Sequence, residues 1–370
     1  MIVAFSHLRW DFVWQRPQQI LSRLAAETPV LFVEEPIGGA SEDTLHLRLE
    51  GPVTVAQPQL RDLPRGPHDS DAGNARIAAL LEPLLADERD LTVWYYTPMA
   101  LGALPAAITP ALTVFDAMDD LASFRFAPPQ MRAREAHMMR EADLVFTGGP
   151  TLYRQRQHRH PRVSCFPSGV DRAHFATPRP SAAAAALARI EGPVIGFYSV
   201  LDERLDTELV AAIADQRPEW TFALIGPLAK ITAADLPVRP NIVHFGMQQY
   251  ADLPGVLAEF DIAMMPFALN DATRAISPTK TLEFFAGGKP VVSTPVADVV
   301  ELYRTATHIA ATPQEFVAAI EEMLGWGPAE YAAWRTEADR LLAAHDWDQI
   351  VAEMSAAMEE QRNSALLLTA

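Results

Sequence analysis

Short apolar runs recur along the first half of the chain and alternate with longer stretches of mixed polarity. The runs are rich in β-branched and aromatic residues, which favours strands, and the stretches between them are long enough for helices. The runs lie at 2–5, 30–33, 91–95, 112–115, 144–147 and 163–166, and 45–59 adds one or two less regular strands. Because parallel neighbours need a helix-length connection, this alternation predicts a parallel sheet covered by helices on both faces.

A second series of the same kind begins after Asp171. Pro178, Pro180 and a run of alanines follow that residue, which is typical of a linker. Further strands are predicted at 194–198, 221–225, 242–245, 262–265, 290–293 and 308–311, and helices from Thr312 onward. We therefore expect two α/β domains with their boundary near Asp171, which also suits a length of 370 residues.

Charge and cysteine content narrow the function. The chain has 47 acidic against 30 basic residues, a net charge of -17, which disfavours binding to nucleic acid. Its single cysteine, Cys165, excludes an intramolecular disulfide and a cysteine-based zinc cluster, and it suits a reducing compartment. The first residues lack a signal-peptide pattern, and no apolar run reaches the ~20 residues of a spanning helix. We expect a cytoplasmic protein that contacts membranes only peripherally.

The segment 277–293 has the pattern of a short helix followed by a buried strand. Ser277 suits the N-cap and Pro278 the first helical position, while Gly287 or Gly288 can end the helix. A helix start of this kind exposes backbone N–H groups and the positive end of the helix dipole. The pattern therefore predicts an anion site at this helix start.

Lys280 and Glu283 add two opposite charges on one face of the same helix. Lys280 can hold phosphate, and Glu283, one turn further, can accept hydrogen bonds from ribose hydroxyls. The alternative is a surface ion pair of little energetic value. Context favours the site, because the segment contains two of only three lysines in the chain and follows the predicted strand 262–265, at the carboxyl end of the sheet.

These motifs resemble the GT-B glycosyltransferases, especially the large retaining family that includes bacterial polysaccharide and sucrose-forming transferases. The run Ser-Pro-x-Lys-x-x-Glu followed by Gly-Lys-Pro-Val-Val, within 277–292, carries the resemblance, and 167–171 is similar to that family's Asn-Gly-Val-Asp element. The resemblance covers nearly the whole chain. It implies two Rossmann-like, doubly wound parallel-sheet domains that face a cleft, followed by a helical C-terminus.

The resemblance also implies domain limits and a donor. Residues 1–171 would bind the acceptor, 172–345 would bind the nucleotide-sugar, and 346–370 would form a helix that packs back on the first domain. The donor would be a UDP-sugar or GDP-sugar, used without a metal or other cofactor. The family commonly has two glutamates separated by seven residues. Glu283 matches the later one, but the earlier position is Ala275, so inversion or retention of configuration cannot be carried over. A smaller set of bacterial exopolysaccharide transferases with Ser-Pro-x-Lys is more similar.

Two loops that follow predicted strands supply candidate catalytic residues. Arg204 lies in a loop similar to the one whose basic residue faces the donor diphosphate in the family, where it would stabilise the leaving group. A solvated ion pair with Asp202 or Glu203 is the alternative. In the loop after 112–115, we expect one carboxylate to take the proton of the acceptor hydroxyl.

The carboxylates of that second loop are Asp116, Asp119 and Asp120. Asp119 is the first candidate for the proton acceptor and Asp116 the second, while Asp120 is a candidate substrate contact. Helix capping by Asp119 or Asp120 is the alternative.

The loop after the first strand is rich in aromatic and polar residues, and such loops face the cleft in GT-B proteins. His7 and Arg16 are its candidate substrate contacts, although a lone histidine is more often structural. Trp10 and Trp14 suit packing positions equally well.

Seven arginines stand against three acidic residues between Arg132 and Arg162. If they share a face, they would hold the domain against an anionic inner leaflet or bind a lipid diphosphate acceptor. Scattered, solvated helix charges are the alternative. His158 and His160 do not make a metal site.

Together these residues predict transfer of a sugar from a nucleoside diphosphate sugar to an acceptor hydroxyl, and the resemblance implies a role in cell-surface polysaccharide or glycolipid synthesis. Ser277, Thr279, Lys280 and Arg204 would hold the diphosphate. Two alternatives remain: a nucleotide-sugar epimerase of the same fold, and a catalytically inactive GT-B scaffold. A dehydrogenase is disfavoured, because no Gly-x-Gly-x-x-Gly follows either first strand.

Overall fold

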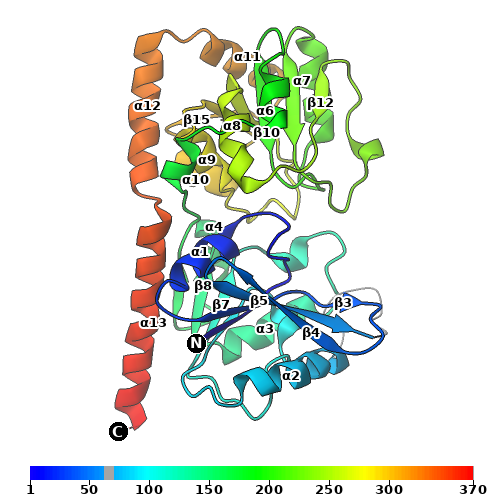
Figure 1. The fold of residues 1–370 in the computed structure, drawn as a ribbon. Helices are drawn as coiled ribbons and strands as arrows, with labels where there is room; N and C mark the ends of the chain where they lie inside the picture. Colours follow the sequence, from blue (N-terminus) through cyan, green and yellow to red (C-terminus); the bar gives the residue numbers. More distant parts are fainter. Residues whose placement is uncertain (62–70, 370) are drawn as a thin grey trace. The chain divides into compact units, whose positions relative to one another are not determined.

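The structure is a computed structural model that describes residues 1–61 and 71–369 (Figure 1). The chain forms two compact units, each with its own hydrophobic core. Unit 1 consists of Met1–Phe166 and Asp348–Ala370, and unit 2 consists of Pro167–Trp347. The chain therefore passes from one unit to the other twice.

Unit 1 is built on a sheet with the strand order β3-β5-β2-β1-β6-β7-β8-β9. All these neighbours are parallel, and β4 pairs antiparallel with β5. The strands are β1 (Ile2–Phe5), β2 (Val30–Val33), β3 (Ile37–Gly38), β4 (Thr44–Glu50), β5 (Val53–Leu60), β6 (Thr92–Tyr95), β7 (Leu112–Ala117), β8 (Leu144–Thr147) and β9 (Val163–Cys165). Every residue of β1, β2 and β6 is buried, as a parallel sheet covered on both faces requires.

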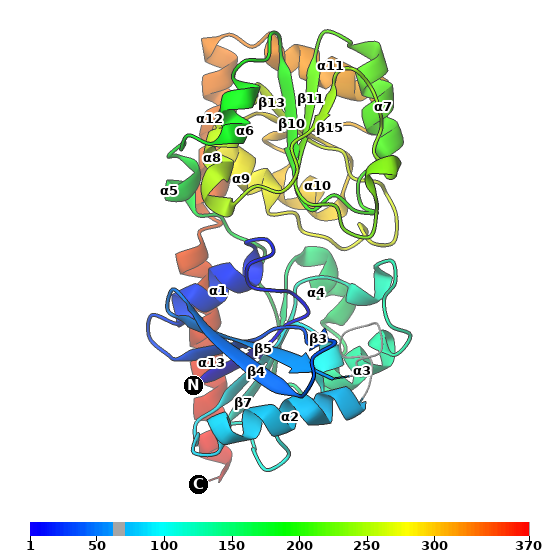
Figure 2. The same cartoon turned by 45° about the vertical axis from the view of Figure 1, so that its right-hand side comes forward.

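Helices cover this sheet and complete unit 1. They are α1 (Arg16–Leu24), α2 (Asp71–Leu85), α3 (Met131–Glu141), α4 (Pro150–Arg156) and α13 (Trp347–Thr369), with short 3-10 turns η1 (Pro98–Ala100) and η2 (Leu121–Ser123). From Asp348 onward α13 belongs to unit 1, and Figure 2 shows it in red next to α1. Arg23 of α1 pairs with Asp348, and Arg362 pairs with Asp90 just before β6.

Unit 2 is built on a six-stranded parallel sheet with the order β12-β11-β10-β13-β14-β15. Its strands are β10 (Val194–Tyr198), β11 (Thr221–Ile225), β12 (Ile242–His244), β13 (Ile262–Met265), β14 (Val291–Ser293) and β15 (Thr307–Ile309). Counted from β10, the order is 3-2-1-4-5-6, which is the Rossmann arrangement. The prediction of two doubly wound α/β domains with a helical C-terminus is confirmed.

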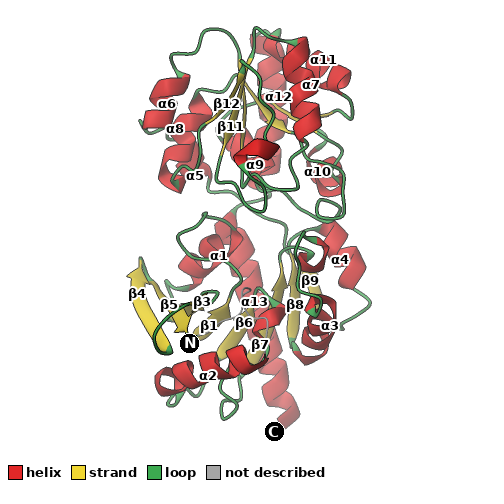
Figure 3. Ribbon diagram, turned by 90° about the vertical axis from the view of Figure 1, so that its right-hand side faces the viewer, coloured by secondary structure: helices red, strands yellow, loops and turns green. Residues whose placement is uncertain are grey.

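Helices lie on both sides of the unit 2 strands, as Figure 3 shows in red and yellow. They are α5 (Arg172–Phe175), α6 (Ala182–Leu187), α7 (Thr207–Gln216), α8 (Leu253–Ala258), α9 (Lys280–Ala286), α10 (Ala297–Tyr303), α11 (Pro313–Leu324) and α12 (Pro328–Ala343), with η3 (Ala233–Asp235) and η4 (Tyr250–Asp252). Among the residues that the structure describes, no helix combines the length and hydrophobicity needed to span a membrane.

The passage from unit 1 to unit 2 lies slightly earlier than the predicted limit at Asp171. The backbone N–H of Val170 donates to the carbonyl oxygen of His345 at 2.9 Å, and the Val170 side chain is part of the unit 2 core. These contacts make the residues from Pro167 onward part of unit 2, although the sequence of 167–171 reads as a crossover.

In each unit the strand order reverses beside the first strand. The neighbours at this point are β1 and β6 in unit 1 and β10 and β13 in unit 2. Open α/β sheets bind ligands outside the carboxyl ends of the strands at such points. The loops after these four strands, together with the loop after β7 that holds Asp119, carry the candidate sites.

Candidate functional site

The helix that follows β13 begins later than expected. α9 starts at Lys280, its N-cap is Thr279 with helical backbone angles (φ -62, ψ -26), and no side chain caps it. The prediction that Ser277 is the N-cap is wrong, because a cap there would bond the N–H of Thr279 or Lys280 and neither bond forms. Instead, the Ser277 Oγ is buried and has no hydrogen-bond partner within the described part of the chain.

Lys280 and Glu283 form an ion pair on the first turn of α9. The Lys280 Nζ donates to both carboxylate oxygens of Glu283, at 3.0 and 2.9 Å. Only 16% of the lysine side chain and 8% of the glutamate side chain are exposed. The shared helix face was predicted, but the pair is largely buried, so its charges interact more strongly than those of a surface pair.

Tyr198, the last residue of β10, packs against this pair and was not singled out by the sequence analysis. Its ring centroid lies 5.1 Å from the Lys280 Nζ, and its ring meets that of Phe284 edge-on at 4.9 Å. Burial first, and the negative charge of Glu283 second, raise the pKa of Tyr198 well above its ordinary value. The available signal was its place at the end of the strand where the order reverses.

The far end of α9 is fixed by residues with a structural role. Arg335 Nη1 donates to the Phe285 carbonyl oxygen at 2.6 Å. The Lys289 Nζ donates to the Ala258 carbonyl oxygen at 2.7 Å and so ties the end of α8, and burial lowers the pKa of Lys289. Of the two lysines in this segment, only Lys280 therefore lies at the candidate site.

Arg204 lies in the loop after β10, and its guanidinium is bound by Asp202. The Arg204 Nε lies 2.9 and 3.1 Å from the two Asp202 oxygens, and Nη2 lies 2.8 Å from Oδ2. The Arg204 carbonyl oxygen accepts from the Ala268 N–H at 2.8 Å, which fastens this loop to the segment after β13. The ion pair considered as the alternative is thus present, and it orients the guanidinium at the carboxyl edge of the sheet.

In unit 1, Asp116 and Arg16 hold each other inside the protein. Their side chains are 0% and 2% exposed, and the Arg16 Nε and Nη2 donate to the carboxylate at 3.0 to 3.1 Å. Arg16 Nη1 also donates to the Phe166 carbonyl oxygen at 2.8 Å. The roles expected for Asp116 as proton acceptor and Arg16 as substrate contact stay predictions, and in this structure both groups are buried in an ion pair with each other.

The neighbouring carboxylates differ from Asp116 in exposure. Asp119 is half-buried in the loop after β7. Asp120 accepts from the Ser123 hydroxyl at 2.6 Å and faces the buried Arg156 at 3.8 Å. Its role as a substrate contact stays a prediction, and in this structure its carboxylate interacts with these two groups. Asp119 remains the candidate for the proton acceptor.

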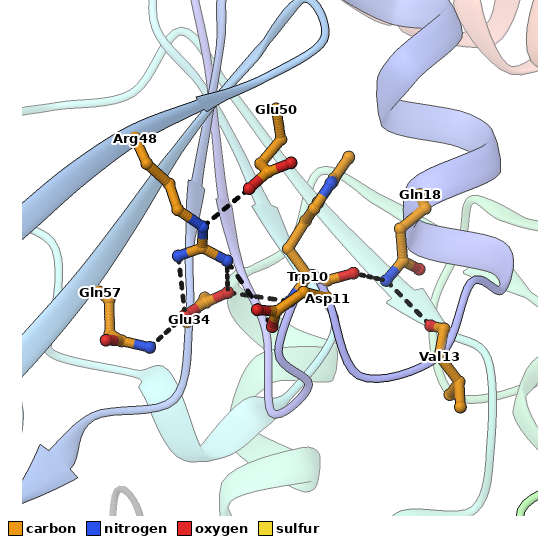
Figure 4. Close-up of polar contacts among 8 residues, drawn as sticks. All are labelled: Trp10, Asp11, Val13, Gln18, Glu34, Arg48, Glu50 and Gln57. Carbon is orange, nitrogen blue, oxygen red and sulfur yellow. Dashed lines mark hydrogen bonds and ion pairs between the residues drawn. The ribbon is translucent and has the colours of Figure 1, made fainter. Parts of the chain in front are cut away.

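The loop after β1 is held by a buried carboxylate that the sequence analysis missed. Glu34, next to the end of β2, is fully buried. Its Oε1 accepts from the Trp10 N–H at 2.9 Å and from Arg48 Nη2 at 2.8 Å, and its Oε2 accepts from Gln57 Nε2 at 2.7 Å (Figure 4). This network fixes the loop that carries the half-buried His7. Trp10 is buried, in line with a packing role.

The arginines of 132–162 do not all lie on a free surface. Arg156 is buried against Glu135, which also binds Arg159 at 3.1 Å, and Arg134 pairs with Asp71. The other arginines of this segment are exposed: Arg132, Arg140, Arg154, Arg159 and Arg162. A single basic face made of all seven is therefore excluded.

Histidine and acidic side chains give no metal centre in the part of the chain that the structure describes. His160 accepts from the Arg162 N–H at 3.0 Å, and its other ring nitrogen lies 3.0 Å from the Ala142 carbonyl oxygen.

Residues 192–325 match the family described as Glycosyl transferases group 1. TuaH of Bacillus subtilis (strain 168), whose name assigns it to teichuronic acid biosynthesis as a glycosyltransferase, is 26% identical over 229 residues. That match covers 59% of this chain and 57% of TuaH, so it spans little more than half of the relative.

Two solved structures resemble the chain over nearly its full length. Sucrose-phosphate synthase from Thermosynechococcus elongatus has a TM-score of 0.73 at 14% identity, covering 100% of this chain and 99% of its own. An E. coli trehalose-6-phosphate structure bound with UDP-2-fluoro glucose has a TM-score of 0.69 at 15% identity, covering 98% of each chain. The chain thus has the GT-B fold, and within it residues 192–325 match the family described as Glycosyl transferases group 1.

Proposed function

We propose that this chain is a hexosyltransferase-like enzyme that moves a sugar from a UDP-sugar or GDP-sugar to an acceptor hydroxyl. The observation that carries the proposal is the Lys280–Glu283 pair, a largely buried cation and carboxylate just beyond the carboxyl end of β13. Both residues lie within the region that matches the group 1 family, which supports glycosyl transfer.

Donor binding would separate Lys280 from Glu283, because different groups of the donor bind each of them. Its diphosphate takes the Lys280 ammonium and the hydroxyls of Ser277 and Thr279, and its ribose hydroxyls donate to the Glu283 carboxylate. The buried Ser277 Oγ supports this assignment, because a buried hydroxyl ordinarily has a hydrogen-bond partner and this one has none within the described residues. The exchange keeps both charges compensated before and after binding.

Arg204 is assigned to the leaving nucleoside diphosphate. Its double contact with Asp202 fixes the guanidinium, and a charge that is already oriented stabilises developing negative charge without reorganisation. With Lys280, it would perform the electrostatic task that a metal ion performs in other transferases, so we propose a metal-independent reaction.

In the transfer step, the acceptor oxygen forms a bond to the anomeric carbon of the donor sugar, and the bond from that carbon to the diphosphate oxygen breaks. The nucleoside diphosphate leaves with the electron pair, and Asp119 accepts the hydroxyl proton. His7, in the loop after β1, is assigned to substrate binding. These roles leave the stereochemical outcome open.

The acceptor we propose is a carbohydrate or lipid-linked glycan of cell-surface polysaccharide synthesis, with the enzyme in the cytoplasm at the inner face of the membrane. The assignment of TuaH to teichuronic acid biosynthesis supports the acceptor class, and the UDP-2-fluoro glucose in the E. coli structure supports a UDP-sugar donor. The exposed Arg132, Arg140 and Arg154 would provide the peripheral contact.

Isothermal titration with UDP and GDP tests the donor site. We expect one of them to bind, with or without EDTA, and Glu283→Ala to weaken it at least about tenfold, because a charged hydrogen-bond acceptor is lost. Glu337→Ala is the matched control, since Glu337 forms an exposed ion pair with Arg340 at the same spacing. Failure of both nucleotides to bind, or binding that Glu283→Ala does not change, contradicts the proposal.

The buried Ala275 favours one alternative, a GT-B scaffold that binds a donor without transferring its sugar. Ala275 is 3% exposed. Because its side chain is a methyl group, this position offers no carboxylate to the donor. Product analysis separates the readings. Transfer to an added acceptor supports the enzyme, conversion of the donor sugar without acceptor indicates an epimerase, and binding without turnover indicates a scaffold.

A further inference from the structure

The Tyr198 ring contacts Lys280 of the candidate donor site, and the charge of Glu283 acts on its hydroxyl. The tyrosine is 2% exposed, and its ring lies 5.1 Å from the Lys280 Nζ and 4.9 Å from the Phe284 ring. The ring is therefore fixed by the first turn of α9. Since Tyr198 also ends β10, the position of its hydroxyl is set by the sheet and the helix together.

The hydroxyl itself is buried, faces Glu283, and makes no hydrogen bond of ordinary length within the described residues. Such a group costs free energy in a protein interior, so it calls for an explanation. The Glu283 charge acts on it and, after burial, helps to keep the phenol protonated, because both raise its pKa. A protonated hydroxyl beside a carboxylate can only donate to it.

The Lys280 ammonium holds both oxygens of that carboxylate, at 3.0 and 2.9 Å. When a diphosphate attracts Lys280, one carboxylate oxygen can receive the ribose, and the other loses its donor. A buried carboxylate oxygen without a donor would leave the side chain poorly oriented and poorly solvated.

We infer that the Tyr198 hydroxyl replaces Lys280 on Glu283 when the donor binds and so orients the carboxylate toward the ribose. Tyr198 is then a positioning residue for donor recognition rather than a catalytic one. The inference rests on the proposed nucleotide-sugar site. It adds Tyr198, at the end of β10, as a residue on which recognition of the ribose depends.

Binding of a nucleoside diphosphate and of its 2′-deoxy counterpart tests the inference, with UDP and dUDP or GDP and dGDP as probes. We expect the wild type to prefer the ribonucleotide by about tenfold, the size of one charge-assisted hydrogen bond. Tyr198→Phe keeps the ring and its contact with Lys280. It should lower this preference to near unity by weakening the ribonucleotide about tenfold while leaving the deoxynucleotide almost unchanged.

A purely structural role would weaken both nucleotides alike and leave their ratio intact, which would overturn the inference. Tyr303→Phe is the control, since Tyr303 is another buried tyrosine of unit 2 and should preserve the ratio. In a double-mutant cycle, Tyr198→Phe should have no further effect on the preference once Glu283→Gln is present. An additive effect would also overturn it. Absence of nucleotide binding by the wild type would instead overturn the proposed function, which separates the two failures.

Discussion

Arg16 and Asp116 show how unit 1 joins distant parts of its sequence through single residues. Arg16 begins α1, Asp116 lies in β7, and the Phe166 carbonyl oxygen that Arg16 also binds lies where the chain leaves the unit. Each charge would be costly if buried alone, and the hydrogen bonds between them offset part of that cost, while burial still raises the pKa of Asp116. The pair therefore has a structural role at the end of β7, next to the loop that carries the candidate Asp119.

Replacing one partner should leave the other charge buried and unpaired. We expect Asp116→Asn to lower the free energy of unfolding by about 3–5 kcal/mol, measured by urea denaturation. Asp348→Asn, which removes an exposed partner of Arg23, should change it little. A variant Asp116→Asn that unfolds like the wild type but has lost transfer activity would contradict the structural role and restore the catalytic one.

At the scale of elements, the loops after β10 and β11 meet backbone to backbone at the carboxyl edge of unit 2. Gly226, directly after β11, has a φ of +137, and a Cβ built on it would lie 1.7 Å from the Ser199 carbonyl oxygen. Only glycine permits both this backbone angle and this approach. The close contact fixes the start of the loop that carries Arg204.

Gly226→Ala should therefore destabilise the protein by at least about 2 kcal/mol, from the strained backbone together with the clash, and should weaken nucleotide binding. Thermal unfolding and titration measure the two effects. Gly325→Ala is the control, because that glycine has a φ of -85 and its built Cβ meets no atom closer than 3.4 Å. Equal behaviour of the two variants would show that the contact at Gly226 does not constrain the loop.

Much of the architecture follows from local sequence, because buried parallel strands read as continuous apolar runs. The hairpin strand β4 is harder to predict from its sequence, because its apolar residues Leu47 and Leu49 are exposed and so do not mark a buried face. At the site, the spacing of Lys280 and Glu283 placed both on one helix face. The failed cap at Ser277 and the role of Tyr198 depend on backbone angles and on contacts between residues far apart in sequence, and neither leaves a local pattern.

At the scale of the whole molecule, unit 1 is discontinuous, since it is closed by residues that follow unit 2. Met354 of α13 is fully buried. Arg362 further along α13 binds Asp90 and the Thr92 hydroxyl, both at 2.6 Å. The C-terminal helix thus belongs to the folding unit of the N-terminal sheet.

Met354→Ala should destabilise unit 1 by about 2–5 kcal/mol, the usual effect of removing a large buried side chain from a core. Differential scanning calorimetry should show a lower transition for unit 1 and little change for unit 2. Met247→Ala, at a position that is 40% exposed in unit 2, should leave both transitions in place. A shift of both transitions by the same amount would mean that the units unfold as one.

The late closure of unit 1 bears on how the protein is made. Residues 167–347 emerge from the ribosome as one continuous stretch and can fold during translation, whereas the earlier 166 residues must wait for the last helix to be synthesised. In that interval the apolar surface of unit 1 against which Met354 will pack stays exposed to solvent. The nascent chain is then prone to aggregation, and chaperones would bind it.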